Sequence, residues 1–326
     1  MLYVRGDKPK KLYDLKQDSS YVVKFERRKE GKKITILSDS MFKAMFQNEN
    51  RIKYSCKLIS YYLDISYEEL LKVLRLGKNE LDKSVESKKG ERCDYVAYIN
   101  GSAINIEVNC NNSLITMERN LEYTHRLYSN KVNKGGYEDY TQVVQINLNN
   151  FAFEDEKTMD VFRIQNKEGI ILSDKIIIVQ IYVPNIRKKW YTSGIESLTE
   201  VEKYILTLVE SDIDISYKLG KGDTIMEEYI EEAVEVSHEE NLGEAYDKEW
   251  ALKDQGLREG FEEGYEHGLE CGFEQGIEQG IEQGKEFGIA ENKKEMIKRM
   301  YQNGLELDLI CKIANVSIEE IEDYIK

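Results

Sequence analysis

The sequence predicts an α/β protein in which helices flank a mixed central sheet, followed by an all-helical C-terminal region. Three observations support this class: a hairpin pattern at 93–110, a helical pattern at 113–130 and a nearly continuous run of β-branched residues at 176–183. Such a run is typical of a strand buried on both faces. Because strand, helix and strand follow the hairpin in order, we expect helices on both sides of the sheet.

The N-terminal residues 1–37 are expected to form a hairpin extension. Two apolar stretches at 21–25 and 34–37 flank a basic turn, and helix formation should begin where Ser38 or Asp39 caps the next segment. The basic turn either contacts phosphate or is a solvated loop; its cations are Arg27, Arg28, Lys29, Lys32 and Lys33.

The dipeptide Asn100–Gly101 strongly predicts a two-residue type I′ turn, which needs positive φ at both positions. This turn places Asp94 opposite Glu107. Side chains alternate between the faces of a strand, so one face is apolar and the other carries the acids. The apolar face holds Tyr95, Ala97, Ile99, Ile104, Ile106 and Val108, and the other holds Asp94, Val96, Asn105, Glu107 and Asn109.

Two directly opposed carboxylates have Cβ atoms roughly 4.5–5.5 Å apart and repel each other. A hard divalent cation such as Mg²⁺ would supply the counter-charge, held by the carboxylates together with water and a substrate phosphate. In the competing interpretation, one carboxylate pairs with Arg92 or with a lysine elsewhere, and the hairpin has no catalytic role. The spacing alone leaves both interpretations open.

The segments after the hairpin complete the expected core. Residues 113–130 fit a helix, 143–148 fit a strand, and Pro184 closes the strand at 176–183. From Ser197 the chain is expected to be helical, with Ser197 as a cap and a second helix from Asp223 to about Trp250. The predicted domains are therefore a core at 38–195 and a helical region at 196–250 that packs on it.

Nine glycines at strict four-residue spacing run from Gly256 to Gly288. They destabilise a helix by about 7–9 kcal/mol relative to alanine, so residues 251–291 are either an oligomerisation helix with close backbone approach or a mobile tail. Frequent glutamates argue against a membrane helix. Residues 292–326 form a small helical cap with a helix–turn–helix rhythm, but Glu319 and Glu320 would repel phosphate, which favours a packing or protein contact.

Charge and composition limit the function classes. The net charge is −15. Residues 227–291 carry 21 acidic and four basic residues, a net of −17, so the rest of the chain has a net charge of about +2. The acidic charge therefore does not exclude a DNA partner. Five scattered cysteines and three histidines without ligand spacing argue against zinc. Without an N-terminal apolar segment or an apolar run near the ~20 residues that span a bilayer, we expect a cytoplasmic protein.

Several segments taken in order resemble the PD-(D/E)XK nuclease superfamily and, within it, the Rpn-type recombination-promoting nuclease and transposase family. The similarity covers about residues 36–326. The matching segments are Asp39-x-x-Phe42-Lys43-x-x-Phe46, Asp94 followed thirteen residues later by Glu107-Val108-Asn109, then Glu118-Arg119 with Tyr123 and Leu127-Tyr128, and finally Gln145 to Phe151.

The resemblance implies a restriction-endonuclease-like core and a metal-dependent DNA endonuclease associated with recombination or transposon-like mobility. Asp94 and Glu107 would hold Mg²⁺, or Mn²⁺, and Asp39 is either a further metal-side acid or a helix cap. Asn109 would be the third catalytic residue, at a position where the family has lysine or glutamine. An amide can orient water there but cannot take a proton.

The same resemblance places four further side chains at the substrate: Lys43, Arg119, Tyr123 and Gln145. The alternative for the cations is a solvated helix face, and for Tyr123 a half-buried aromatic. Because Asn109 is uncharged, a second hypothesis is a catalytically impaired nuclease fold that acts through residues 251–291 as an oligomer or partner-binding segment. A third is a toxin or phage-defence effector on the same core. The expected partners are DNA and further copies of the chain, with no membrane.

Overall fold

The computed structural model describes residues 12, 15–79, 92–110, 113–129 and 142–325. The chain divides into two compact units, 1–252 and 253–326. Residue 130, the predicted end of the 113–130 helix, lies outside the described residues. No helix within the described ranges is both long and apolar enough to cross a bilayer.

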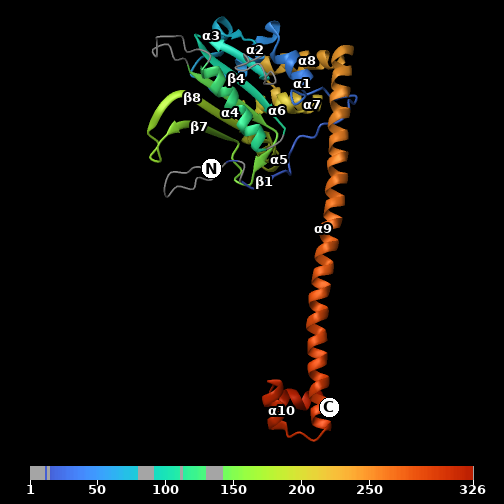
Figure 1. Cartoon of the computed structure of the whole chain (residues 1–326). Coiled ribbons are helices and arrows are strands. Elements are labelled where there is room, and N and C mark those ends of the chain that lie inside the picture. Colours follow the sequence, from blue (N-terminus) through green and yellow to red (C-terminus); the bar gives the residue numbers. More distant parts are fainter. Residues whose placement is uncertain (1–11, 13–14, 80–91, 111–112, 130–141, 326) are drawn as a thin grey trace, which may run out of the picture. The chain divides into compact units, whose positions relative to one another are not determined.

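In the described part of the first unit, six strands form one mixed sheet (Figure 1), in the order β2-β3-β4-β5-β8-β7. The neighbours β4, β5 and β8 are parallel and the other pairs are antiparallel. The α/β class is therefore confirmed. The strands are β2 (Arg75–Leu76), β3 (Tyr95–Ile99), β4 (Ser102–Asn109), β5 (Val143–Asn149), β7 (Met159–Gln165) and β8 (Ile171–Tyr182).

The β3–β4 hairpin has the predicted register. Asn100 and Gly101 have φ of 46° and 89°, as a type I′ turn requires. Ile99 pairs with Ser102, and Tyr95 pairs with Ile106. The side chains alternate as expected, and the apolar face of the hairpin joins the largest hydrophobic cluster of the protein.

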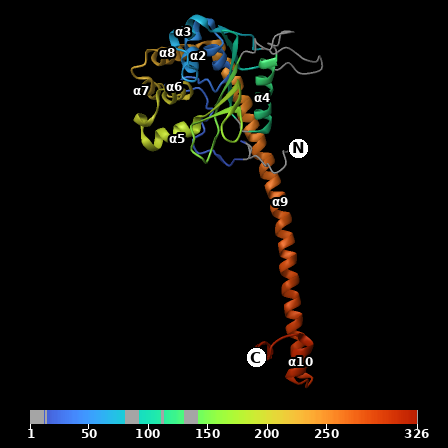
Figure 2. The same cartoon turned by 90° about the vertical axis from the view of Figure 1, so that its left-hand side faces the viewer.

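Helices cover the two faces of the sheet unequally. Figure 2 shows α4 (Leu114–Ser129) on one side, with α2, α3 and α5 to α8 on the other. The second group packs on the apolar face and encloses the main core. Its members and their short neighbours are α1 (Asp39–Phe46), η2 (Glu49–Arg51), α2 (Ile52–Ser60), α3 (Tyr67–Val73), α5 (Val183–Ser193), η3 (Ile195–Ser197), α6 (Glu200–Val209), α7 (Ile213–Gly220) and α8 (Thr224–His238).

The hairpin predicted within residues 1–37 is wrong. Residues 22–30 form no strand; instead, β1 (Gln17–Asp18) pairs with β6 (Ala152–Phe153), and a single bridge joins Lys32 to Asp212. The reason is that distant groups satisfy this backbone. The Asn150 side chain accepts a hydrogen bond from the N–H of Val23 at 2.8 Å and donates one to its carbonyl at 2.8 Å.

The cap of α6 also differs from the prediction. Ser197 ends a short 3₁₀ turn, and α6 begins at Glu200 after its cap Thr199, which forms a reciprocal capping box with Glu202. Thr199 accepts from the N–H of Glu202, while the Glu202 carboxylate accepts from the N–H of Thr199. Asp223, by contrast, caps α8 as expected.

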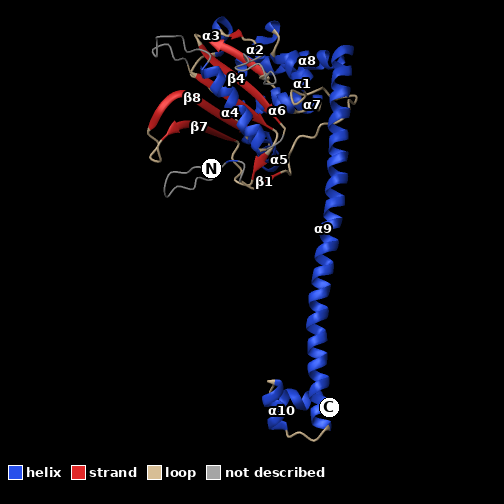
Figure 3. Cartoon of the chain, viewed as in Figure 1, coloured by secondary structure: helices blue, strands red, loops and turns tan. Residues whose placement is uncertain are grey.

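The C-terminal region is helical, as predicted (Figure 3). It comprises α9 (Glu240–Gln302), α10 (Leu307–Ala314) and α11 (Ile318–Ile325). The end of α9 packs with α10 and α11 around a small apolar cluster centred on Ile297, Ile310 and Ile321. This cluster gives the cap at 292–326 its own core.

Candidate active site

Asp94 and Glu107 lie next to each other at one end of the β3–β4 hairpin. The backbone N–H of Asp94 donates to Glu107 Oε1 at 3.1 Å, and the N–H of Val108 donates to Asp94 Oδ2 at 3.0 Å. Glu107 is only 1% exposed, whereas Asp94 is partly exposed. The pair is therefore a buried acid beside an acid that solvent can reach.

The surroundings of the pair disfavour two negative charges. Burial raises the pKa of Glu107, and the charge of Asp94 raises that pKa further. Burial also raises the pKa of Asp94, against the opposing effect of the Val108 N–H. The positive charge of Arg119 lowers both values. A cation placed between the carboxylates would therefore be stabilised.

Asn109 is 2% exposed, and other side chains hold both ends of its amide. Its Nδ2 donates to Asn149 Oδ1 at 3.0 Å. Its Oδ1 accepts from Asn120 Nδ2 at 3.3 Å and from Arg119 Nη2 at 3.4 Å. The orientation of this amide is thus fixed, and Arg119 brings a positive charge to the side chain that was predicted to be the third catalytic residue.

Asn109 belongs to a buried layer of polar side chains between the sheet and α4, which we call the amide layer. The parallel register places Asn105 beside Gln145, Glu107 beside Asn147 and Asn109 beside Asn149. The members of the layer besides Glu107 are Asn105, Asn109, Gln145, Asn147, Asn149 and Gln180 from the strands, with Asn120 and Thr124 from α4.

Sequence reasoning placed Asn105, Glu107 and Asn109 on one face of the hairpin but missed the rest of the layer. The signal was present, because Gln145, Asn147 and Asn149 repeat the same alternation in the next strand.

Asp39 and Lys43, both on α1, were also predicted to belong to the site. Ser38, not Asp39, is the N-cap of α1, because its hydroxyl accepts from the N–H of Met41. The carboxylate of Asp39 instead forms an ion pair with Lys43, one turn along the helix. Both residues are near enough to act on Asp94, whose pKa the charge of Asp39 raises and that of Lys43 lowers.

The remaining predicted substrate residues differ in their access to solvent. Arg119 is exposed, and its guanidinium carbon lies 5.9 Å from the centre of the Tyr123 ring. Tyr123 is 5% exposed and packs with Val96 and neighbouring apolar residues, which favours a structural aromatic over a substrate contact and buries it more fully than the half-buried alternative predicted. Gln145 is fully buried and bonded within the amide layer, so it orders that layer rather than offering a surface contact.

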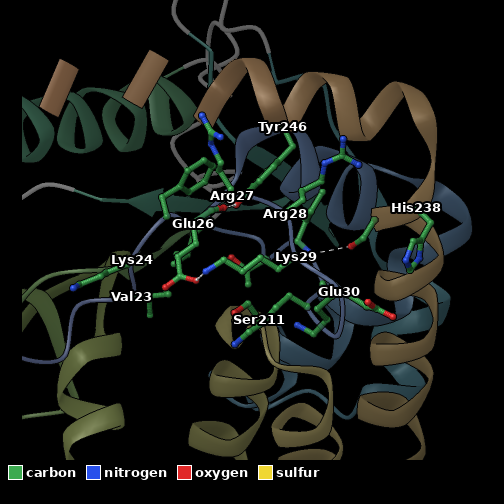
Figure 4. A pocket seen from close by; sticks show the side chains of 17 residues that line it. Val23, Lys24, Glu26, Arg27, Arg28, Lys29, Glu30, Ser211, His238 and Tyr246 are labelled. Atoms are coloured by element: carbon green, nitrogen blue, oxygen red, sulfur yellow. Dashed lines mark hydrogen bonds and ion pairs between the residues drawn. The ribbon is translucent and has the colours of Figure 1, made fainter. Parts of the chain in front are cut away.

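The basic residues of the N-terminal segment line a pocket of about 350 Å³ (Figure 4), together with residues of α8 and α9 such as His238 and Tyr246. Several of these cations already have partners inside the protein. Arg28 pairs with Asp247, Lys29 with Glu26 and Lys32 with Asp212. Lys33 donates to the carbonyls of Thr207 and Glu210 at 2.9 and 2.6 Å. These internal pairs weaken the interpretation of this segment as a phosphate contact.

The Asp94–Glu107 pair fits a hard divalent cation. Both donors are carboxylate oxygens, and their charged forms are disfavoured by burial and by mutual repulsion. Within the described ranges, no group of three or more His, Cys, Asp or Glu side chains is arranged to hold a metal. The remaining ligands would have to be water or substrate, as is usual for Mg²⁺.

Comparison with known proteins gives one finding. A protein-family model described as PD-(D/E)XK nuclease family transposase matches residues 36–255. Searches of curated proteins and of solved structures found no match. The matched region contains both carboxylates, Asn109 and all of α4.

Proposed function

We propose, because the chain belongs to the PD-(D/E)XK nuclease family transposases, that it is a metal-dependent endonuclease that hydrolyses DNA phosphodiester bonds in recombination or transposon-like mobility. The observation that carries this proposal is the contact between the hairpin ends. The N–H of Asp94 lies 3.1 Å from Glu107 Oε1, so the two acids meet where one of them is open to solvent.

Asp94 and Glu107 are the residues that would hold Mg²⁺ or Mn²⁺. When bound, the ion polarises the phosphodiester and lowers the pKa of a water molecule. The protein contributes a fixed geometry, because Val108 anchors one oxygen of Asp94 and Asp94 anchors one oxygen of Glu107. Asp39 lies near enough to affect Asp94 electrostatically and would be a third acid on the metal side.

Asn109 and Arg119 would together replace the lysine that the family has at the third catalytic position. The amide of Asn109 is held on both sides and cannot take a proton, so its contribution is to orient neighbouring groups. The exposed guanidinium of Arg119 supplies positive charge beside the carboxylates and could bind phosphate in a bidentate manner. Lys43 would add a second phosphate contact from α1.

A plasmid-nicking assay with Mg²⁺ or Mn²⁺ tests the proposal. The variants Asp94→Asn and Glu107→Gln keep the size of each side chain and remove its charge. Both should abolish nicking, whereas Glu122→Gln, an acid on α4 that pairs with Arg126, should nick like the wild type. Equal nicking by all four proteins, or none by any, would remove the endonuclease from consideration.

The second function to consider is a binding protein that has lost its chemistry, and one observation favours it. Asn109 has no charge, and its two amide atoms are both engaged. The same assay separates the two functions, because an impaired protein would bind DNA without nicking it.

We further propose that residues 251–291 join copies of the chain. In support, a Cβ added at Gly256, Gly280 or Gly288 would meet no neighbouring atom within 4 Å in the described structure. This surface is therefore open to a second backbone.

A further inference from the structure

A second pocket, of about 390 Å³, lies beside α4 and over strands β5, β7 and β8. It is distinct from the carboxylate pair, since neither Asp94 nor Glu107 lines it. Apolar and amide side chains make up most of its lining. The lining includes Asn120 and Leu121 of α4, Phe162 of β7 and Gln180 of β8.

The lining indicates a neutral ligand with flat apolar faces and polar edges. Among the described residues that line it there is no lysine or arginine, and Glu118 is the charged one, so these residues would repel a phosphate. Phe162 is 44% exposed and Leu121 is 47% exposed, which leaves an aromatic ring and an aliphatic side chain available for contact. Of the four amides in its lining, those of Asn120 and Gln180 retain some exposure, at 5% and 6%, and supply donors and acceptors, whereas Gln145 and Asn147 are fully buried behind them.

Two of these amides have hydrogen-bonding capacity that the described structure leaves unused. Asn120 Oδ1, an acceptor, and Asn147 Nδ2, a donor, are buried without a partner among the described residues. Each such atom costs about 1–3 kcal/mol in the folded state. Because neither atom is exposed, a ligand that offers a donor and an acceptor on neighbouring atoms would recover part of that energy only by displacing the side chains in front of them.

We propose that this pocket binds a nucleobase. A base has apolar faces that can stack on Phe162 and an edge that amide side chains can read, as asparagine and glutamine do with adenine. The base could belong to an unpaired nucleotide of a DNA strand or to a free nucleoside. The DNA source rests on the proposed function, and the nucleoside source does not.

The pocket is connected to the candidate active site through Asn120. The Nδ2 group of Asn120 donates to Asn109 Oδ1 at 3.3 Å and to Asn147 Oδ1 at 3.2 Å. Asn147 lines the pocket, and Asn109 occupies the third motif position. An occupied pocket would therefore act on the same amide that orients Asn109.

The test measures binding without cleavage, by fluorescence anisotropy in EDTA. It uses duplexes of about 20 base pairs, a length that covers a typical footprint. One duplex is fully paired and the other contains a central mismatch, because a mismatched base costs least to extrude. Leu121→Trp fills the pocket, and Phe162→Ala removes its ring. Ile115→Trp is the matched control, since Ile115 lies on the same helix outside the pocket and is 79% exposed.

We expect the wild type and Ile115→Trp to bind the mismatched duplex about tenfold more tightly than the paired one, and this ratio should fall to about one in both pocket variants. A second arm titrates adenosine and cytidine by calorimetry. Saturable nucleoside binding that Leu121→Trp abolishes supports the pocket with a free nucleoside as its source.

The inference is overturned if the two ratios are equal in every variant and no nucleoside binds. If that result is obtained while the wild type still nicks plasmid in the separate Mg²⁺ assay, the pocket inference fails alone. If the wild type neither binds DNA in EDTA nor nicks it with Mg²⁺, the proposed function fails, and the nucleoside arm still decides whether the pocket takes a base.

Discussion

Replacing Arg119 by glutamine tests whether a positive charge from α4 substitutes for the lysine that the third motif position lacks. The guanidinium contacts Asn109 Oδ1 at 3.4 Å and lowers the pKa of both Asp94 and Glu107. Removing one preorganised donor at a reacting centre typically lowers kcat by about 10²–10³-fold. Arg119 is exposed, so water screens its charge. We therefore expect the lower limit, about 10²-fold, or about 2.7 kcal/mol.

The rescue variant makes this test specific. In Arg119→Gln, the further change Asn109→Lys returns a charge to the motif position, and we expect it to recover at least about tenfold in nicking rate, which is 1.4 kcal/mol. The assay is single-turnover nicking at saturating Mg²⁺, with a parallel measurement of DNA affinity in EDTA. If Arg119→Gln weakens only affinity and Asn109→Lys restores nothing, Arg119 is a phosphate contact and the substitution argument is refuted.

Three further predictions concern stability and assembly. Asn149→Leu should lower the free energy of unfolding by about 2–5 kcal/mol, because it leaves Asn109 Nδ2 and Gln180 Oε1 without their partner. Urea denaturation measures this free energy. A loss below about 1 kcal/mol would mean that the amide layer rearranges freely. Burial lowers the pKa of Lys33 to about 7, so the unfolded chain binds its proton between about pH 7 and pH 10 while the folded chain releases it. Wild-type stability should then rise relative to Lys33→Met between pH 7 and pH 9, and a pH-independent difference between the two proteins would contradict this. Alanine at Gly280, Gly284 and Gly288 should stabilise α9 by up to about 1 kcal/mol per site, which circular dichroism measures. The same substitutions should weaken self-association of the chain in sedimentation experiments. Unchanged self-association would exclude close backbone approach at these glycines.

The carboxylate pair could be predicted from sequence because local geometry determines it. A two-residue turn at Asn100 and Gly101 fixes the register of both strands, and Asp94 and Glu107 follow from counting outwards. No information from distant parts of the chain is needed. The same holds for Asp223, which caps the helix that immediately follows it.

The amide layer could not be predicted in the same way, because distant residues create it. The bond from Asn109 to Asn149 joins residues that are 40 positions apart, and it depends on the parallel register between β4 and β5. The sequence between them includes α4, whose placement decides which strand lies beside β4. The incorrect N-terminal hairpin has a similar origin, since Val23 bonds to Asn150 rather than to a neighbouring strand.

The position of the amide layer explains why an uncharged residue can stand at Asn109. A lysine there would bring its own charge, whereas a short amide needs neighbours that hold it and a cation from elsewhere. In the amide layer, Asn149 and Asn120 hold the amide of Asn109, and Arg119 of α4 supplies the positive charge.

The amide layer has an energetic cost, because buried donors and acceptors such as Asn147 Nδ2 remain without partners among the described residues. Proteins depart from full polar satisfaction mainly at functional sites. Here Asn120, whose Oδ1 is unpaired, bonds directly to Asn109, and Asn147 is one further hydrogen bond away. The amide at Asn109 and the incompletely paired polar layer are therefore best understood as one arrangement, which lysine at position 109 alone, with Arg119 retained, would disturb rather than improve.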